Sequence, residues 1–211
     1  MKIGILNSGM SNIKSVYRAL EVVGGNPIII EPETTSRHFD VLVIPGVGTF
    51  ESGMGALNVS CLIDKIYEHN MSGRPLLGIC LGMQIFFQRS EESRGVSGLS
   101  FLPGVVKPIG HMMTGREFGI PNIGYNYVNS YAKNESYLSK SLSGYYYFMH
   151  SYAIETPPQD LDIYGVTEFN GKKYLSFLIK NNICGIQFHP EKSGKRGLFL
   201  LKNIIEYYKK Y

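Results

Sequence analysis

A cysteine with a glycine two residues away on either side, in Gly78-Ile79-Cys80-Leu81-Gly82, has the spacing of a nucleophile on a sharp strand-to-helix turn. Such a turn strains the backbone of the nucleophile, and side chains two residues before and after it would collide. The Cys80 sulfur would lie at the amino end of a helix, whose partial positive charge favours thiolate over thiol. The Leu81 N–H would point toward a developing oxyanion. We therefore predict that Cys80 is a nucleophile, although a free cysteine is more often a small apolar core residue.

A thiolate nucleophile usually works with a histidine that a carboxylate or amide holds in one tautomer. Among the five histidines, His189 in "ICGIQFHPEKSG" fits this role best. Strand alternation puts Gln187 and His189 on one face, and Pro190 ends the strand. Glu191 is close enough to accept the proton of the other ring nitrogen. Alone, His-Pro-Glu is more often a surface turn. Both motifs are expected at the carboxyl edge of one sheet, which favours a triad of Cys80, His189 and Glu191.

A second glycine pair follows another buried strand, in "VIPGVGTFESGMG". The backbone N–H groups around Gly46, Val47 and Gly48 are free to turn toward a ligand. If this strand neighbours the one that ends at Cys80, the loop supplies a second oxyanion donor beside Leu81. Otherwise the loop is a plain turn. The segment lacks the G-x-G-x-x-G and G-K-[ST] patterns, so it does not predict a nucleotide site.

Composition limits the class of protein. The chain has 211 residues, 44% of them apolar, so we expect a single domain over residues 1–211. The formal net charge is +4 without a long basic run, which argues against a nucleic-acid partner. No segment reaches the roughly 18 apolar residues of a membrane helix. The N-terminal "MKIGILNSGM" is interpreted as a first core strand, not a secretion signal.

The three cysteines predict neither a disulfide framework nor a zinc site. They are odd in number and form no C-x-x-C pair, which favours a reducing cytoplasm. Cys80, Cys184 and His189 do not have the spacing of zinc ligands, so we expect no metal and no cofactor. Cys61 and Cys184 are predicted to be core residues.

Apolar runs and helical periodicities alternate through the first half of the chain. The predicted strands cover 2–6, 26–31, 40–46 and 74–80, and the predicted helices cover 13–24, 61–70 and 81–92. This rhythm predicts a mostly parallel sheet with helices on both faces. From Val105 to Phe188, short β-rich segments separated by turns such as Asn170-Gly171 predict an antiparallel portion. A final helix is predicted from residue 194 onward.

These motifs resemble those of the class I, or triad, glutamine amidotransferases. The likeness rests on residues 78–84 and 187–191 and extends over nearly the whole chain. The segments "GMSNIKSV", "PGVGTF", "LPGVV", "FMHSY" and "QFHPEKSGKRGLFLLKN" are similar to those of the HisH family, the glutaminase subunits of imidazole glycerol phosphate synthase. The resemblance implies a three-layer α/β/α fold with a central, mostly parallel sheet and an antiparallel β-rich addition.

The resemblance also implies a reaction. Cys80 would attack the side-chain amide of glutamine to form a glutamyl thioester, His189 would pass the proton to departing ammonia, and Glu191 would orient His189. The implied oxyanion hole comprises Val47, Gly48 and Leu81. The implied substrate-binding residues are Gly46, Gln84, Glu92 (with Glu91 an equally reachable neighbour), His150 and Ser151.

The ammonia would pass through a channel to a partner protein. The resemblance implies a heterodimer with a separate (β/α)₈-barrel synthase chain. That chain would make imidazole glycerol phosphate and an aminoimidazole carboxamide ribotide in histidine biosynthesis.

The chain also departs from the family pattern. The usual Asp-Tyr is Asn7-Ser8, Ser11 stands in place of a glycine, and Pro-His-Met-Gly-Trp-Asn becomes Pro-Asn-Ile-Gly-Tyr-Asn over 121–126. In the family these segments face the partner or the seam between the two proteins. A paralogous glutaminase that feeds a sugar amidotransferase for surface polysaccharide is therefore an alternative. A cysteine hydrolase or peptidase acting alone, and a non-catalytic binding protein, are further alternatives; "GMQ", "HPEK" and the intact triad residues count against them.

Overall fold

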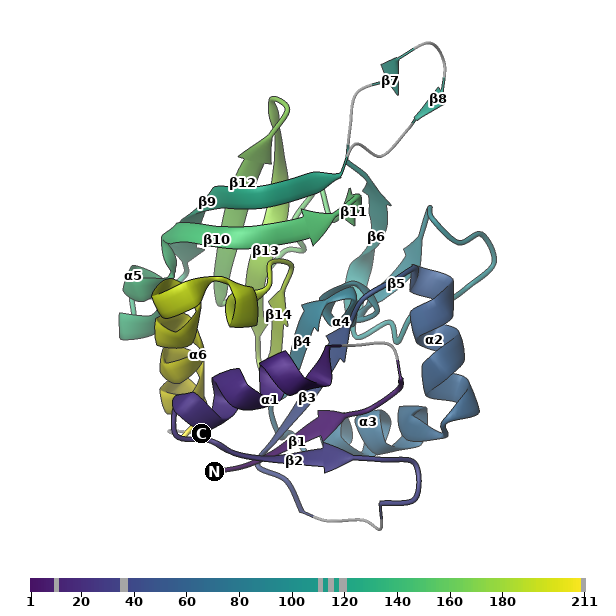
Figure 1. Ribbon diagram of the computed structural model, residues 1–211. Coiled ribbons are helices and arrows are strands. Elements are labelled where there is room, and N and C mark those ends of the chain that lie inside the picture. The colour runs from purple at the N-terminus through teal and green to yellow at the C-terminus, as the bar shows by residue number, and fades with distance from the viewer. Residues whose placement is uncertain (10–11, 35–37, 110–111, 114–115, 118–120, 210–211) are drawn as a thin grey trace.

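Strands and helices alternate in the first half of the computed structural model, and strands dominate the second half (Figure 1). The structure describes residues 1–9, 12–34, 38–109, 112–113, 116–117 and 121–209. The strands are β1 (Lys2–Leu6), β2 (Asn26–Ile30), β3 (Val41–Gly46), β4 (Leu76–Cys80), β5 (Phe87–Ser90), β6 (Leu102–Pro108), β7 (Met112–Met113), β8 (Arg116–Glu117), β9 (Asn122–Ala132), β10 (Gly144–His150), β11 (Tyr152–Ala153), β12 (Ile163–Phe169), β13 (Lys172–Lys180) and β14 (Ile183–Ile186). The helices are α1 (Ile13–Val22), α2 (Phe50–Val59), α3 (Leu62–Met71), α4 (Leu81–Gln84), α5 (Tyr137–Leu142) and α6 (Gly194–Tyr208), with a 3₁₀ turn η1 (Pro190–Lys192).

The main sheet joins a parallel core to an antiparallel extension. Over the described residues its strand order is β10-β9-β12-β13-β14-β4-β3-β1-β2. The strands from β14 to β2 are parallel to one another. The strands from β10 to β13 form the extension, in which each strand is antiparallel to its neighbours. Every residue of β3 and β4 is buried, as expected for central strands covered on both faces.

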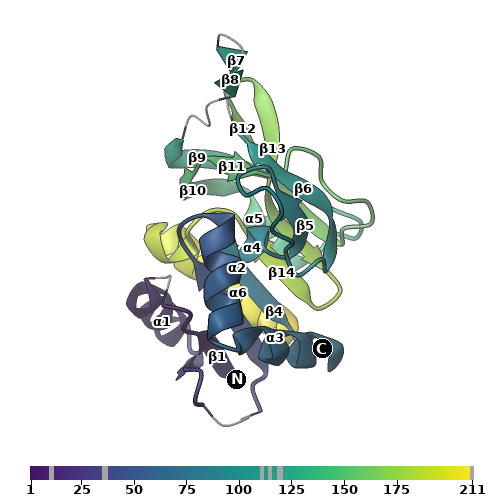
Figure 2. The ribbon, with the colours of Figure 1, turned by 90° about the vertical axis from the view of Figure 1, so that its right-hand side faces the viewer.

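Helices cover both faces of the sheet and make three layers. On one face, α1, α5 and α6 pack over an apolar core that includes Ile5 and Leu201. On the other, α2 and α3 pack over a second core that includes Leu42 and Ile66. The two views show α1 and α6 on one side of the sheet and α2 and α3 on the other (Figures 1 and 2). The predicted α/β/α fold with an antiparallel β-rich addition is therefore confirmed.

The predicted helix over 81–92 is wrong beyond Gln84. Helix α4 has only four residues, and the chain then enters β5, which pairs in parallel with β6. The reason is burial: residues 81–87 are all buried, whereas a surface helix would bury a single stripe. The apolar run is a short helix followed by a buried strand, and the sequence period alone does not separate these two cases.

Strand β14, the last strand along the chain, joins the antiparallel and parallel parts of the sheet. The sequence pattern groups β14 with the antiparallel segments, and it is indeed antiparallel to β13. It is also parallel to β4, so it lies beside the strand that ends at Cys80. The turn between β12 and β13 contains Asn170 and Gly171 with φ of 51° and 73°, which are the values of a type I′ hairpin turn.

Part of one family segment, Met10 and Ser11, lies outside the described residues. Within the described part of the chain, no helix has the length and apolar character needed to cross a membrane.

Candidate active site

Cys80 stands at a strained turn between β4 and α4. Its φ of 55° and ψ of −110° form a conformation that non-glycine residues avoid, at a cost of order 1–3 kcal/mol. A Cβ added at Gly78 would lie 2.6 Å from the carbonyl carbon of Gly82. A Cβ at Gly82 would lie 2.9 Å from the carbonyl carbon of Ile44 on β3, and closer still to its oxygen. The turn therefore requires both glycines for steric reasons.

Parallel pairing brings the histidine motif to the same edge of the sheet. Strand β4 lies between β3 and β14, and the three strands end on the same side. Ile79 pairs with Ile186, and His189 follows three residues later at the start of η1. The His189 backbone N–H donates to the Tyr147 carbonyl at 2.8 Å, which ties the motif to β10. Two segments far apart in the chain thus meet beside the Cys80 thiol.

A buried carboxylate fixes the orientation of His189. Its Nδ1 lies 2.8 Å from Oε1 of Glu191, and both side chains are 3% exposed. Since the carboxylate accepts the Nδ1 proton, Nε2 is the ring nitrogen left for a second partner. Nε2 makes no hydrogen bond of normal geometry with the described residues. The Cys80 thiol is nevertheless close enough to act on the pKa of this imidazole.

The charge balance of the site favours an imidazolium. Burial lowers the pKa of His189, but hydrogen bonding and charge interactions with Cys80 and Glu191 outweigh burial and raise that pKa to about 10. At neutral pH this imidazole carries a proton, which the neighbouring Glu191 carboxylate stabilises. The helix dipole expected from the sequence is a minor influence, because α4 has only four residues.

A cavity of about 210 Å³ opens over the sulfur. It is lined by Val47, Gly48, Cys80, Leu81, Gln84, Glu92, Met149, His150, Ser151 and Tyr152. Most of the side chains that the sequence suggested for substrate and oxyanion thus face one space. A larger hollow of about 670 Å³ lies over β5 and the loop after it, and it shares Tyr152 with this cavity but has no cysteine in its lining.

The loop after β3 lies directly beside the nucleophile turn. Gly46 pairs in register with Cys80, which fulfils the condition set for a second oxyanion donor. Gly48 has a φ of 106°, a value that favours glycine. Gly46 does not line the 210 Å³ cavity; a Cβ there would lie 3.0 Å from the Leu81 Cβ. Close packing against Leu81 accounts for a glycine at position 46, and its contact with substrate stays a prediction.

The structure separates the two neighbouring glutamates. Glu92 is half-buried and lines the cavity, and its Oε2 accepts a hydrogen bond of 2.8 Å from the Phe50 N–H at the start of α2. Glu91 is exposed and lines the larger hollow outside. Glu92 is therefore the carboxylate that faces the space above Cys80.

Gln84 is held by the site on two sides. Its Nε2 donates to the Tyr152 carbonyl at 2.8 Å and to Oε1 of Gln187 at 3.0 Å. Both protons of this amide nitrogen are used, so Gln84 can offer a ligand only its Oε1. The sequence places Gln187 on the same strand face as His189 but assigns it no role. The alternation of side chains along residues 186–189 was the signal that could have placed Gln187 in the site. Met149 and Tyr152 were also missed as cavity residues.

His150 is neutral and its tautomer is fixed. Its Nδ1 lies 2.9 Å from the Tyr152 carbonyl, which accepts only, so Nδ1 carries the proton. Nε2 then accepts from Asn122 Nδ2 at 3.4 Å. Burial, with a smaller effect from the charge of His189, lowers the pKa of His150 to about 4, against the opposing influence of the Tyr152 carbonyl. Asn122, one of the departures from the family pattern, is thus buried in the site and not on the outer surface.

The other two cysteines differ from each other. Cys184 is fully buried in the core as predicted, and burial raises the pKa of its thiol. The prediction of a core position for Cys61 is wrong, because this residue is exposed in the left-handed turn between α2 and α3, with φ of 53°. Over the part of the chain that the structure describes, no group of three His, Cys, Asp or Glu side chains is arranged to hold a metal ion.

The fold and this arrangement define a thiol-dependent amide-hydrolysing domain, and comparison with known proteins gives its family. A model of the class I glutamine amidotransferase family matches residues 4–206, and the chain belongs to that family. It is 38% identical over 201 residues to the imidazole glycerol phosphate synthase subunit HisH of Bacillus mycoides, covering 95% of this chain and 92% of that one. It is 39% identical over 205 residues to the protein of the same name from Chlorobaculum tepidum, covering 96% and 98%.

Solved structures support the same fold. A crystal structure of a glutamine amidotransferase has a TM-score of 0.70 and 14% sequence identity, with 99% of this chain and 97% of that one covered. The structure of PurLQS from Thermotoga maritima has a TM-score of 0.67 at 16% identity, with 98% of each chain covered. At these identities the likeness concerns the fold alone.

Proposed function

We propose that this chain is the glutamine-hydrolysing subunit of an imidazole glycerol phosphate synthase and serves histidine biosynthesis. The observation that carries the proposal is the meeting of Cys80, His189 and Glu191 at one sheet edge, above a cavity of about 210 Å³. The identity to HisH subunits over nearly the whole chain supports the choice of subfamily. The reaction converts glutamine and water into glutamate and ammonia.

The first half of the reaction forms a thioester. The Cys80 thiolate attacks the side-chain carbonyl carbon of glutamine, and its oxygen becomes an oxyanion. The backbone N–H groups of Leu81 and of the Val47–Gly48 loop stabilise that charge. The imidazolium of His189 donates its Nε2 proton to the amide nitrogen, the C–N bond breaks, and ammonia leaves. Glu191 keeps the ring oriented throughout, because its carboxylate holds the Nδ1 proton.

The second half releases glutamate. Neutral His189 accepts a proton from a water molecule, which attacks the thioester carbon at the position that ammonia left. The tetrahedral intermediate collapses with expulsion of the Cys80 thiolate, and the proton stays on His189. The imidazolium–thiolate pair that the raised pKa of His189 favours is thereby restored.

Substrate orientation follows from the charges around the cavity. The Glu92 carboxylate binds the α-ammonium group of glutamine, since its Oε1 is not engaged by the Phe50 N–H. Gln84 accepts from the substrate through its Oε1, because both Nε2 protons are used. His150 and Ser151 form the opposite wall beside Met149. Neutral His150 adds no positive charge that would compete with the ammonium group for Glu92.

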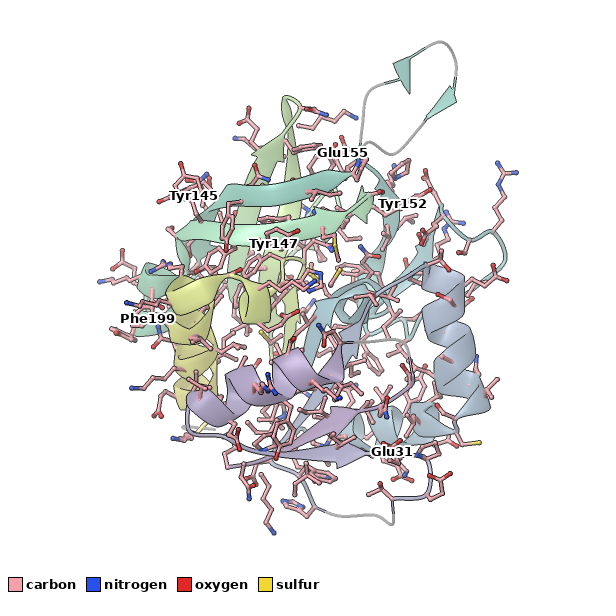
Figure 3. All side chains as sticks on the ribbon, viewed as in Figure 1. Glu31, Tyr145, Tyr147, Tyr152, Glu155 and Phe199 are labelled. Atoms are coloured by element: carbon pink, nitrogen blue, oxygen red, sulfur yellow. The ribbon has the colours of Figure 1, made fainter. Side chains whose placement is uncertain are left out.

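The partner docks on the outer surface of the antiparallel extension. This surface, here called the tyrosine face, comprises the exposed side chains of Ile123, Tyr125, Tyr127, Tyr145 and Met149, together with half-buried Tyr147. Cross-strand pairs build it, with ring centroids 5.6 Å apart for Tyr125 and Tyr147 and 5.1 Å for Tyr127 and Tyr145. Figure 3 shows Tyr145 and Tyr147 along β10.

The tyrosine face is continuous with the cavity above Cys80, which supports docking of the ammonia-receiving partner on this face. Met149 belongs to the tyrosine face and also lines the space above Cys80, so ammonia formed there lies next to the exposed surface. A (β/α)₈-barrel synthase protein seated on this face in a heterodimer would cover the cavity mouth and receive ammonia without loss to solvent. Such a surface of exposed aromatic rings is characteristic of a protein–protein interface.

Departures from the family pattern favour one alternative acceptor. Tyr125 occupies the centre of the tyrosine face, where the family has tryptophan, so the surface offered to the partner differs. The alternative is a barrel partner that uses the ammonia to aminate a sugar for surface polysaccharide. Both versions keep the same glutaminase chemistry at Cys80.

The test is to co-express the chain with candidate barrel proteins and to measure glutamate formation. We expect hydrolysis to rise on addition of the imidazole glycerol phosphate synthase barrel, and Cys80→Ala to abolish it. Tyr147→Glu should remove the rise, whereas Tyr137→Glu should not, because Tyr137 is 69% exposed on α5 over the opposite face. A rise only with a sugar-modifying partner would favour the alternative, and undiminished turnover by Cys80→Ala would refute the mechanism.

A further inference from the structure

A buried glutamine with no role in the reaction above contacts the nucleophile. Gln187 is 1% exposed, and its Nε2 donates to the Cys80 Sγ at 3.8 Å. Its Oε1 accepts from Gln84 at 3.0 Å. Both polar atoms of this amide are therefore engaged inside the protein, one of them by the reacting sulfur.

Hydrogen bonding fixes the direction of this amide. A backbone carbonyl accepts only, so the atom of Gln84 that contacts the Tyr152 carbonyl at 2.8 Å must be its nitrogen. The second proton of that nitrogen goes to Gln187, whose facing atom must then be its oxygen. The nitrogen of Gln187 is consequently turned toward the Cys80 sulfur. The direction of both side-chain amides follows from one main-chain oxygen.

We propose that Gln187 is a catalytic residue that donates an N–H hydrogen bond to the Cys80 thiolate. The role rests on the proposed function, since it concerns the same nucleophile. His189, two residues further along the same motif, exchanges a proton with the sulfur during the reaction. Gln187 has no proton to give up at neutral pH, so its donor stays in place while His189 changes its charge.

The donor is matched to the charge state of the sulfur. A neutral thiol is a weak acceptor, whereas a thiolate gains from a charge-assisted hydrogen bond. The thiol form instead has the Met149 carbonyl as an acceptor at 4.0 Å, which gives its proton a separate direction. An amide in this position thus favours attack and also favours return of the thiolate when the thioester breaks.

Core packing alone does not account for an amide here. Burying an amide is unfavourable unless both of its polar atoms are paired, and an apolar side chain of equal length would fill the space without that cost. The pairing also links the nucleophile to the substrate cavity, because Gln84 and Tyr152 both line it. A ligand that hydrogen-bonds to Gln84 therefore also affects the position of the Gln187 amide that donates to the sulfur.

The test measures the rate at which iodoacetamide alkylates Cys80 as a function of pH, by peptide mass spectrometry. The thiolate displaces iodide, so the pH of half-maximal rate reports how easily the thiolate forms. Gln187→Met keeps the length and removes the donor, and we expect the midpoint to rise by about one pH unit. Gln187→Glu, a second variant of the same shape, places a negative charge near the sulfur and should raise the midpoint further.

Two controls make the result specific. Gln159→Met applies the same chemical change at an exposed position outside the site and should leave the profile unchanged. Alkylation of exposed Cys61 in the same sample should keep its own midpoint in every variant. The other ionisable groups around the sulfur, His189, Glu191, His150 and Glu92, are retained in all of these proteins.

A Cys80 midpoint that stays at the wild-type pH in either folded Gln187 variant would overturn the inference. This outcome is distinct from failure of the proposed function, in which the wild-type chain with its partner would not hydrolyse glutamine at all. A rise in both variants, with wild-type turnover intact and Gln159→Met unchanged, would support the role of Gln187.

Discussion

Adding one methyl group at Gly82 should distort the turn that presents the nucleophile. The new Cβ would lie 2.9 Å from the carbonyl carbon of Ile44 and closer to its oxygen. Both atoms belong to the backbone of β3, a central strand paired on both sides, so no side-chain rotation relieves the clash. Overpacking typically costs 1–3 kcal/mol; because this clash is with backbone we take the upper end, from which alanine recovers about 1 kcal/mol of helix propensity. We expect Gly82→Ala to lose about 2 kcal/mol of unfolding free energy.

The assay is urea unfolding of Gly82→Ala beside a matched variant, Gly55→Ala. Gly55 lies inside α2, and a Cβ there would meet nothing within 4 Å, so alanine should add about 0.5–1 kcal/mol of stability. We expect the urea midpoint of Gly82→Ala to fall by about 1 M. Alkylation of Cys80 should slow at the same time, because the turn is displaced. A Gly82→Ala midpoint and alkylation rate equal to those of wild type would refute the steric account.

Three further predictions concern the ionisable groups of the site. The folded-state pKa of His189 is raised to about 10 from 6.5, so the folded state holds a proton that the unfolded state loses. The stability that His189 contributes is therefore complete below pH 6.5 and is lost as pH rises toward 10. Urea titrations of wild type and His189→Gln should show this pH dependence only in wild type. His150, with its pKa lowered to about 4, should remain neutral with the proton on Nδ1 at pH 5.5, and a ¹⁵N spectrum of an imidazolium there would contradict this. Glu92→Gln keeps an acceptor for Phe50 but removes the charge, so KM for glutamine should rise about 10- to 100-fold while Cys80 alkylation is unchanged; an unchanged KM would exclude Glu92 as the ammonium site.

Local steric rules made much of the fold and the nucleophile turn predictable from the sequence. The requirement for hydrogen at positions 78 and 82 follows from the turn alone, and the structure has the same collisions. The parallel strands were predictable because they are short, continuous apolar runs between turn residues. The carboxyl ends of parallel strands meet at one edge, so the expectation that Cys80 and His189 are neighbours needed no distance information.

Other features depend on long-range packing that no local pattern records. The stretch after Gln84 has helical spacing, but pairing with β6 makes its second part a strand. Cys61 lies between polar Ser60 and apolar Leu62, a pattern that does not decide its burial, and its exposure depends on how α2 and α3 meet. The direction of the Gln187 amide is set by the Tyr152 carbonyl, 35 residues away in the chain, and only the folded arrangement reveals it.

The central claim is that the Cys80 thiolate, served by His189, opens the amide of glutamine. The most direct test treats the chain, together with its barrel partner, with an electrophilic analogue of glutamine and maps the adduct by mass spectrometry. We predict one adduct, on Cys80, that excess glutamine prevents and that His189→Gln slows. Labelling of exposed Cys61 in its place, or a Cys80 that stays unmodified while glutamine is being hydrolysed, would contradict the account.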